Sequence, residues 1–364
     1  MPKRFDKKPT MIDVAKAAKV SLATVSAAIN QSAPVSEATR ARIDKAIRRV
    51  GYKANAIARS LKTGTTSTIG LMVADITNPF FTTAIHAIQE VAHRHNYSVM
   101  LCCSDEDPDK ERTHLRLLAD RMVDGFIVAT AGETPELRDL VEGGRAPVVL
   151  IDRHVDGLEA DAVVIDNVAA TRDAVGHLVL AGHRRIGLIT GRRTLSTGRE
   201  RYEGYRRALS EAGIAFEPAL VGSAHFGADD GYQAANKLLS LKDRPTAIFA
   251  CNNLSGLGLM RALHDAGLRC PDDVAVACFD DFDWAEVFHP RLTTVAQPTQ
   301  AIGIQAMMML LERMRDDTAR ALPPRLVRLK AHLNVRDSSR LPASSSSPRS
   351  GEVPRHTGRR GHEP

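Results

Sequence analysis

The stretch at residues 10–30, TMIDVAKAAKVSLATVSAAIN, constrains the fold more than any other part of the chain. Thr10 can cap a first helix, and Asp13, three residues later, can complete a capping box. Ser21 can cap a second helix that ends at Asn30. Lys19 falls in the short turn between them, so we expect two short helices that cross steeply, as in a helix-turn-helix. The second helix of such a motif enters the major groove of DNA.

A basic third helix follows this pair. It is predicted over residues 36–50, and Gly51 is its stop signal. Through residue 62 the chain carries 14 Lys and Arg against 4 Asp and Glu, a net charge of +10, whereas the whole chain has only +6. A solvated basic face is an alternative interpretation, but it does not explain why the charge is concentrated before residue 63. The asymmetry predicts a polyanionic partner for the N-terminal segment.

Several separate motifs, in the same order, resemble the lactose-repressor (LacI/GalR) family of bacterial transcriptional regulators. After residues 10–30 come YKAN at 52–55, ARSL at 58–61, and then IGLMVADITNPFF, FDD and LTTVAQP. The resemblance covers nearly everything before residue 336. It implies a helix-turn-helix DNA-binding headpiece at 1–54, a hinge helix and linker at 55–66, and a two-lobed ligand-binding and dimerisation domain at 67–336. Residues 337–364 are rich in Ser, Pro, Arg and Gly, and we expect a disordered tail there.

The resemblance also implies a set of DNA-contacting residues. By position these are Thr10, Ser21, Leu22, Ala23, Thr24, Ser26, Ala27, Asn30, Asn55, Leu61 and Lys62. Leu61 matches the hinge-helix leucine that the family inserts into the minor groove, and such apolar wedges bend the duplex. Without the resemblance, a plain linker is the simpler interpretation of residues 55–62.

Three departures from the family pattern affect DNA binding. The base-reading positions hold Leu22, Ala23 and Ala27, which can offer only apolar contacts, for instance to thymine methyl groups. Lys19 replaces a glycine often found in the turn, and Ala54 replaces a proline often found before the hinge helix. If position 19 needs a positive φ, the lysine costs on the order of 1 kcal/mol.

From residue 67 onward, short apolar runs alternate with helical stretches. Strands are predicted over 68–74, 98–103, 125–129, 148–151, 162–165, 185–190, 219–222, 246–250 and 274–278. Helices are predicted over 79–95, 108–122, 167–181, 198–213, 229–241, 254–267 and, after LTTVAQP, over 299–315 as a return to the first lobe. This alternation is typical of parallel sheets, and its two series indicate two doubly wound α/β lobes. The predicted class is a periplasmic-binding-protein-like sensor with a cleft between lobes.

Candidate ligand-binding residues lie at or just after the ends of the predicted strands. They are Asp75, Asn78, Phe80, Phe81, Asp152, Arg153, Arg199, Phe226, Asn252, Asp280, Trp284 and Gln297. Phe80 and Phe81 can stack on a sugar ring or belong to the core, and Asp152-Arg153 can bind vicinal hydroxyls or form a surface ion pair. Arg199 is taken from the match to sugar-binding relatives. Together the set predicts a pocket for a small polyhydroxylated ligand: a sugar, sugar acid or phosphate ester.

These observations favour a ligand-responsive transcriptional regulator, most simply a repressor of a carbohydrate or sugar-acid operon. We expect a homodimer on a pseudo-palindromic operator, with a tetramer left open. A transport-type solute-binding protein would share the sensor but needs an export signal and no basic headpiece. An enzyme acting on a sugar is a further alternative, yet neither GxGxxG after the first strand nor GxxxxGK[ST] is present.

Composition gives the remaining expectations. The five cysteines follow no metal-binding spacing, and we expect neither metal nor cofactor. No run of 18 apolar residues occurs, and the N-terminus lacks an apolar signal core, so we expect a cytoplasmic, nucleoid-associated protein without a membrane partner.

Overall fold

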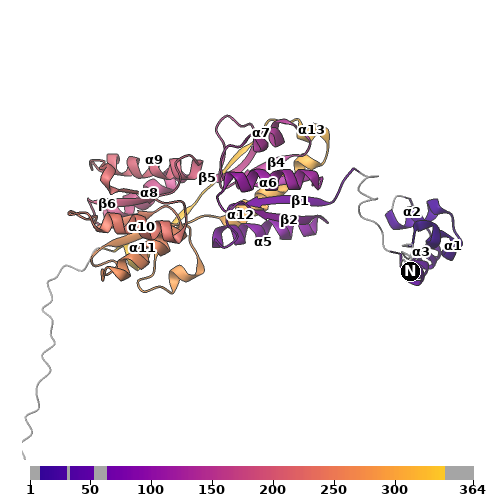
Figure 1. The fold of residues 1–364 in the computed structure, drawn as a ribbon, viewed down its shortest axis with the longest axis horizontal. Coiled ribbons are helices and arrows are strands. Elements are labelled where there is room, and N and C mark those ends of the chain that lie inside the picture. Colours follow the sequence, from indigo (N-terminus) through magenta and orange to yellow (C-terminus); the bar gives the residue numbers. More distant parts are fainter. Residues whose placement is uncertain (1–8, 31–32, 53–63, 341–364) are drawn as a thin grey trace, which may run out of the picture. The chain divides into compact units, whose positions relative to one another are not determined.

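The computed structural model describes residues 9–30, 33–52 and 64–340 (Figure 1). The chain divides into two compact units, Met1–Ser67 and Thr68–Pro364, which we call the headpiece and the sensor. Within the described residues, no helix is long and apolar enough to cross a membrane.

The headpiece contains three helices, α1 (Met11–Ala18), α2 (Leu22–Asn30) and α3 (Glu37–Val50), each close to its predicted bounds. The predicted caps are present: Asp13 Oδ2 accepts from the Thr10 backbone N–H at 2.8 Å, and Ser21 Oγ accepts from the Thr24 N–H at 3.1 Å. The three helices pack on a small core of Val14, Ala15, Ala18, Val25, Ala28, Ile43 and Ala46. Small residues at these contacts let short helices approach closely.

The turn between α1 and α2 holds a left-handed residue, so the condition set for the cost at position 19 is met. Lys19 has φ 54° and caps α1, and its position leads directly into Ser21 and α2. A side chain at positive φ costs about 1–2 kcal/mol relative to glycine. The lysine is therefore retained at some cost to headpiece stability.

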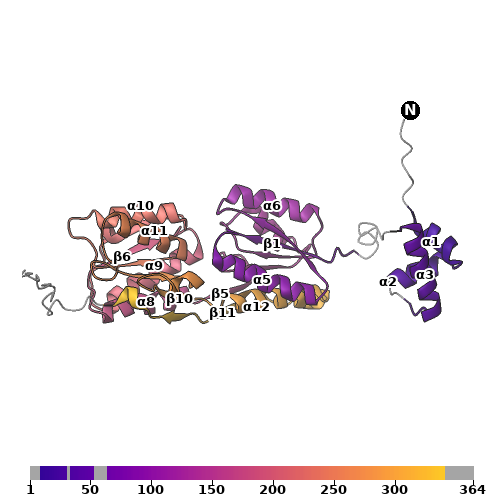
Figure 2. The ribbon, with the colours of Figure 1, turned by 90° about the horizontal axis from the view of Figure 1, so that it is seen from below.

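The first lobe of the sensor is a six-stranded parallel sheet in the order β11-β5-β4-β3-β1-β2. Its strands are β1 (Thr68–Val73), β2 (Ser98–Cys103), β3 (Gly125–Val128), β4 (Val148–Ile151), β5 (Asp161–Ile165) and β11 (Leu326–Leu329). Its helices are α5 (Pro79–Arg94), α6 (Pro108–Asp120) and α7 (Pro135–Glu142). Figure 2 shows α6 on one side of this sheet and α5 with α12 on the other. Because both faces are covered, the central strands are apolar throughout.

The second lobe repeats this design in the order β12-β10-β9-β8-β6-β7. Its strands are β6 (Ile186–Thr190), β7 (Val221–Ser223), β8 (Ala247–Ala250), β9 (Ala275–Phe279), β10 (Thr293–Ala296) and the antiparallel β12 (His332–Asn334). Its helices are α8 (Asn167–Leu180), α9 (Ser196–Glu211), α10 (Ala228–Leu239) and α11 (Asn253–Asp265), with short 3-10 turns η1 (Pro218–Leu220) and η2 (Asp283–Glu286). In Figure 2, α10 and α11 cover one face and α8 and α9 the other.

Three segments connect the lobes: β5 to α8, β10 to α12 (Thr299–Met314), and β11 to β12, with α13 (Asp317–Arg320) between α12 and β11. The return helix α12 packs against α5 and against β3, β4 and β5 of the first lobe, as predicted. Its buried residues include Ile302, Ala306, Met309 and Leu310. Three short crossings let the lobes change their relation without unfolding either sheet.

The structure corrects the predictions at the C-terminal end. The expected tail at 337–364 begins too early, because η3 (Asp337–Ser339) is folded against the second lobe. Ser338 Oγ donates to the Val276 carbonyl at 2.7 Å, and Ser338 and Ser339 are fully buried. The predicted crossover LTTVAQP also holds a strand, β10, and β11, β12 and α7 were not predicted. Length alone does not explain this, because β4 and β8 are equally short and were predicted. The strands β11 and β12 are defined by pairing with β5 and β10, which are far away in sequence.

Candidate functional site

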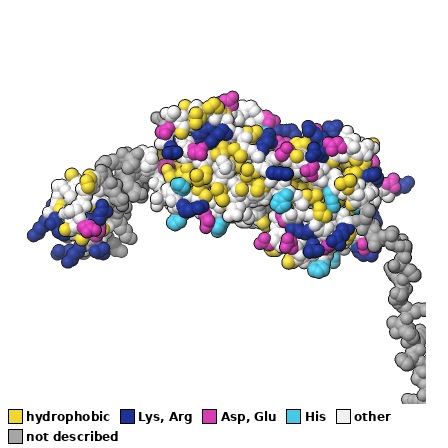
Figure 3. Space-filling model, turned by 180° about the vertical axis from the view of Figure 1, so that it is seen from behind, with side chains coloured by type: hydrophobic (Ala, Val, Ile, Leu, Met, Phe, Trp, Pro, Cys, Tyr) yellow, Lys and Arg dark blue, Asp and Glu magenta, His cyan; other side chains and the backbone are white. Residues whose placement is uncertain are grey.

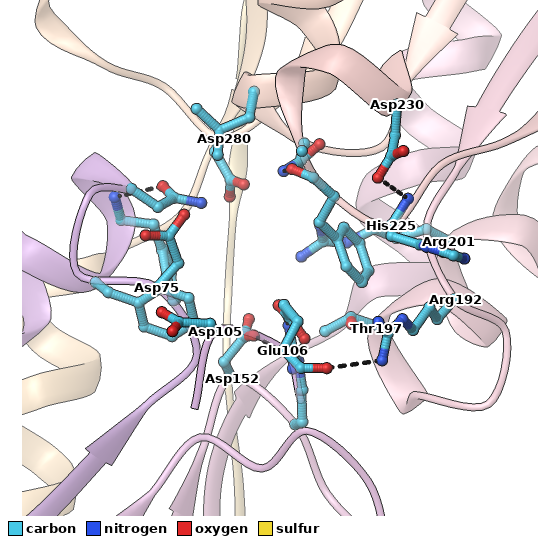
Figure 4. A pocket seen from close by; sticks show the side chains of 18 residues that line it. Asp75, Asp105, Glu106, Asp152, Arg192, Thr197, Arg201, His225, Asp230 and Asp280 are labelled. Carbon is cyan, nitrogen blue, oxygen red and sulfur yellow. Dashed lines mark hydrogen bonds and ion pairs between the residues drawn. The ribbon is translucent and has the colours of Figure 1, made fainter. Parts of the chain in front are cut away.

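A cavity of about 370 Å³ lies between the lobes of the sensor, at the carboxyl ends of both sheets. It is lined by Asp75, Asn78, Phe80, Phe81, Asp105, Glu106, Asp152, Arg153, Arg192, Thr197, Arg201, His225, Phe226, Gly227, Asp230, Asn252, Leu254 and Asp280. Figure 4 shows Asp75 and Asp105 facing Arg192, His225 and Thr197 across the space. Nine of the twelve predicted ligand-binding residues line it, which fits the rule that doubly wound sheets present ligand sites at this edge.

The start of α5 forms one wall of the cavity. Asn78 caps α5, with its Oδ1 accepting from the Phe80 N–H at 3.0 Å. The same oxygen accepts from Asn253 Nδ2 of the second lobe at 3.0 Å, so the cap also joins the two lobes. Phe80 and Phe81 are buried edge to face, 5.0 Å apart, and both line the cavity. The two alternatives for these rings, core or ligand wall, are therefore compatible.

Asp152 and Arg153 are buried and do not form a surface ion pair. Arg153 donates through both terminal nitrogens to Glu106, at 2.8 and 2.5 Å, and to the Thr130 carbonyl at 2.7 Å. Its Nε lies 3.2 Å from Asp152 Oδ2 without hydrogen-bond geometry. Burial raises the pKa of Asp152 to about 6, partly offset by the charge of Arg153. Because Arg153 is already occupied, Asp152 is left as an acceptor toward the cavity.

Asp280 is the matching carboxylate of the second lobe. It follows β9 in a left-handed conformation, φ 68°, and is buried. Its Oδ1 accepts from Gln297 Nε2 at 2.6 Å, and burial raises its pKa while Arg201 lowers it. Gln297 itself was predicted to touch the ligand. In this structure Gln297 supports Asp280 and does not line the cavity.

Arg201, and not the predicted Arg199, is the arginine of α9 that faces the cavity. Arg201 donates to Asn167 Oδ1 at 2.8 Å and to the Cys251 carbonyl at 2.6 Å, and it stacks on Phe279 at 3.7 Å. Arg199 instead pairs with Asp156 of the first lobe at 2.7 Å, outside the cavity. The two arginines are two residues apart on a helix, roughly 200° around the axis, so only one can face inward. Thr197, four residues before Arg201, shares its face and has a buried hydroxyl with no partner in the described residues.

Trp284 was also predicted to wall the pocket and does not. It lies on η2, is 62% exposed, and is absent from the cavity lining. The aromatic plate of the second lobe is Phe226, whose carbonyl accepts from Asn252 Nδ2 at 2.7 Å and whose ring lies 5.4 Å from the Arg153 guanidinium. A Cβ at Gly191 would lie 2.0 Å from this ring, so only glycine fits there.

Sequence reasoning missed half of the lining residues: Asp105, Glu106, Arg192, Thr197, Arg201, His225, Gly227, Asp230 and Leu254. Most of them follow β2, β6 or β7, so the strand-end rule used for Asp75 would have found them. Arg192 donates to the Glu106 carbonyl at 2.7 Å, a further contact between the lobes. The Asp230 carboxylate accepts from the His225 N–H at 3.3 Å.

The candidate DNA surface is the exposed start of α2. Ser21, Leu22 and Ala23 are exposed, Leu22 to 47%, while Thr24, Ser26 and Ala27 are half-buried. Val25 and Ala28 turn inward to the core. Thr10 caps α1, and Asn30 ends α2, with a side chain that is not described. The predicted contacts at Asn55, Leu61 and Lys62 lie outside the described residues.

A helix-turn-helix headpiece joined to a two-lobed sensor with a polar interlobe cavity defines a ligand-responsive transcriptional regulator. Residues 10–55 match the model of bacterial regulatory proteins of the lacI family, and residues 175–339 match a periplasmic binding protein-like domain. The chain is 37% identical over 312 residues to the HTH-type transcriptional repressor PurR of Mannheimia succiniciproducens, covering 85% of this chain and 93% of that protein. The chain therefore belongs to the lacI family of bacterial regulatory proteins. Its relatives are transcriptional repressors and not enzymes.

Solved structures agree with this assignment. The lac repressor dimer bound to operator and the anti-inducer ONPF has a TM-score of 0.80 at 26% identity, covering 92% of this chain and all of that one. A complex of the transcriptional regulator CelR with cellobiose has a TM-score of 0.69 at 32% identity, covering 91% and 100%.

Proposed function

We propose that this repressor binds a neutral, hydroxyl-rich effector of the sugar class in the interlobe cavity. The observation that carries the proposal is the pair of buried carboxylates, Asp152 and Asp280, placed one on each lobe. Carboxylates are acceptors only, so they select ligands that bring donors, such as vicinal hydroxyl groups. A ligand that bridges the two acids holds both lobes at once.

The charge of the cavity disfavours an anionic effector. Six acidic residues line it against three arginines, and Arg153 and Arg192 are already bonded to Glu106. Arg201 is the remaining guanidinium, and it lies among Asp152 and Asp280, whose pKa values it influences. A carboxylate or phosphate group would therefore face like charge, and the sugar-acid and phosphate-ester options become the weaker ones. The cellobiose complex of the CelR regulator fits the neutral-sugar proposal.

A purine base is the second candidate effector. Relatives carry the name PurR, and Phe80, Phe81 and Phe226 line the cavity. A planar base can stack on such rings. In that case affinity depends chiefly on the aromatic plates and less on Asp152.

Calorimetry with the full chain separates these options. The panel comprises neutral mono- and disaccharides, the matching sugar acids, and purine bases, each titrated into the wild type, Asp280→Asn and Phe226→Leu. We expect a neutral sugar to bind, and Asp280→Asn to weaken it by about tenfold or more, because a charge-assisted hydrogen bond contributes about 1.5–3 kcal/mol. Binding of a purine but no sugar, or of a sugar acid in preference to its neutral parent, would refute the proposal.

On the DNA side we propose a dimer that places α2 of each headpiece in successive major grooves of a near-palindromic operator. Leu22, Ala23 and Ala27 would then offer apolar contacts only, so sequence preference rests also on DNA shape and deformability. Effector binding would change the arrangement of the two lobes relative to each other by movement at the three connecting segments. This change would in turn alter the affinity of the protein for its operator.

A further inference from the structure

The headpiece carries a second basic surface that includes no residue of α2. A hollow of about 250 Å³ lies along the seam between α1 and α3, lined by Ala17, Ala18, Lys19, Arg42, Lys45, Ala46 and Arg49. Its lining comprises three alanines and four cations. Figure 3 shows Lys and Arg side chains gathered on the headpiece. We call the four cations Lys19, Arg42, Lys45 and Arg49 the seam cluster.

Charge is segregated around α3. Arg42, Lys45 and Arg49 are spaced i, i+3 and i+7, so they share one flank, and all three are exposed. The opposite flank mixes signs, with Glu37, Arg40, Asp44 and Arg48. Within the described residues no acidic group forms an ion pair with the seam cluster. Like charges at these spacings destabilise a helix, so an anion bound at the seam would relieve a repulsion that the fold leaves uncompensated.

The hollow and the exposed start of α2 are formed by different residues. Leu22 and Ala23 belong to α2, whereas the hollow is lined by the end of α1, by Lys19 of the turn and by one flank of α3. Arg42, Lys45 and Arg49 are therefore not part of the recognition helix.

We propose that the seam cluster binds the phosphate backbone of a second segment of duplex DNA. Several cations around a hollow with alanines in its lining fit the phosphates spaced along a strand. The proposed contact is with the backbone, and so it is independent of sequence. A repressor seated on its operator through α2 can hold a neighbouring stretch of DNA through the seam, which allows direct transfer between segments.

The test is capture of a second duplex by the full chain. The protein is saturated with a donor-labelled duplex carrying the best sequence from a binding-site selection, and an acceptor-labelled random duplex of about 20 base pairs is added. We expect energy transfer that falls steeply with salt. In Arg42→Gln/Lys45→Gln/Arg49→Gln, capture should weaken by about tenfold or more, and the slope of log K against log salt should fall by about 2.7. Operator affinity should stay within about twofold of the wild type.

The matched control is Arg40→Gln/Arg48→Gln on the mixed flank of the same helix, which should leave capture unchanged. Glutamine is a good helix former, and all five substituted residues have side chains outside the core, so the variants should keep the wild-type circular dichroism and melting temperature. Capture that survives in the triple variant overturns the proposal. Equal weakening of operator binding and capture overturns it too, since the seam would then touch the same duplex as α2. Effector binding in the sensor is unaffected by either outcome.

Discussion

At the scale of single residues, buried acidic side chains determine how the stability of this protein depends on pH. Glu111 of α6 is fully buried, accepts from the Thr130 hydroxyl at 2.9 Å and also from the Ala131 N–H, and so holds the segment after β3. Burial raises the pKa of Glu111 to about 7, although both hydrogen bonds lower it. The ionised form is therefore costly in the folded state.

The pH dependence of stability follows from this shift. Between the unfolded value and about 7, the folded protein binds more protons at Glu111 than the unfolded chain, so stability falls as pH rises through that window. The loss amounts to about 1.4 kcal/mol per unit of pKa shift at most. Glu111→Gln removes the charge, keeps one oxygen that can accept from the Ala131 N–H, and places an NH2 group beside the Thr130 hydroxyl, to which it can donate. We expect it to raise the melting temperature above about pH 8 and to leave it nearly unchanged near pH 4.5.

Thermal melts of the wild type and Glu111→Gln across this range give the measurement. A difference that is the same at both ends of the range would contradict the assignment, because it would show that Glu111 does not titrate in the window. Asp152, with its pKa near 6, should behave in the same direction, and a falling pH should weaken effector binding as this acceptor gains a proton.

Helix α9 shows how an element determines which residues reach the cavity. Arg201 faces inward, whereas Arg199 pairs with Asp156 at the surface, 43% exposed. We expect Arg201→Lys to weaken effector binding by about tenfold or more, since a lysine cannot reproduce the bonds to Asn167 and Cys251 or the stacking on Phe279. Arg199→Lys, the matched control, should change affinity by less than about twofold. Calorimetry with the identified effector measures the affinity of both variants. A larger loss of affinity in Arg199→Lys than in Arg201→Lys would contradict this account and would favour the original prediction that Arg199 contacts the ligand.

Helices α10 and α11 depend on glycine for their close packing. A Cβ at Gly258 would lie 2.1 Å from the Ala228 carbonyl oxygen and 2.5 Å from the Tyr232 nitrogen. Because these are backbone atoms, the helices must move apart, and we expect Gly258→Ala to cost about 1–3 kcal/mol. Gly176 in α8 has open space around its Cβ position, so Gly176→Ala should be neutral or stabilising by up to about 1 kcal/mol. Similar melting temperatures for the two variants would refute this account of the packing.

The sequence predicts elements well where their signals are local. Thr10 with Asp13, and Ser21 with Thr24, mark helix starts through contacts within three residues, and apolar runs mark the central strands such as β1 and β9. The strands β11 and β12 carry no such signal, because they are defined by pairing with β5 and β10, far away in sequence. Ser338 and Ser339 look like tail residues until the contact with Val276 and Thr293 is known.

The sequence predicts a residue of the cavity lining well when that residue directly follows a strand. Asp75, Asp152 and Asp280 follow strands directly, and their side chains line the cavity. Arg199 and Gln297 do not line the cavity, and the reason is different. Which face of α9 turns inward, and whether Gln297 contacts a ligand or supports Asp280, depend on three-dimensional packing that spacing alone does not encode.

At the scale of the whole molecule, the described contacts between lobes are few and polar around the cavity. Asn253 donates to Asn78, Arg192 donates to the Glu106 carbonyl, and the His154 N–H donates to Ser196 Oγ at 3.1 Å. A polar interface of this kind rearranges at a lower free-energy cost than the apolar core of either lobe. A ligand that joins Asp152 to Asp280 can therefore shift the balance between lobe arrangements.

The most direct test of the account is the coupling between cavity and DNA, measured in both directions on the full chain. Operator affinity is determined with and without the effector found by calorimetry, and effector affinity is determined with and without operator. We predict that both change by the same factor, about fivefold or more, and that Asp280→Asn abolishes the change. An operator affinity that is identical with an empty and a saturated cavity would contradict the claim that this cavity controls DNA binding.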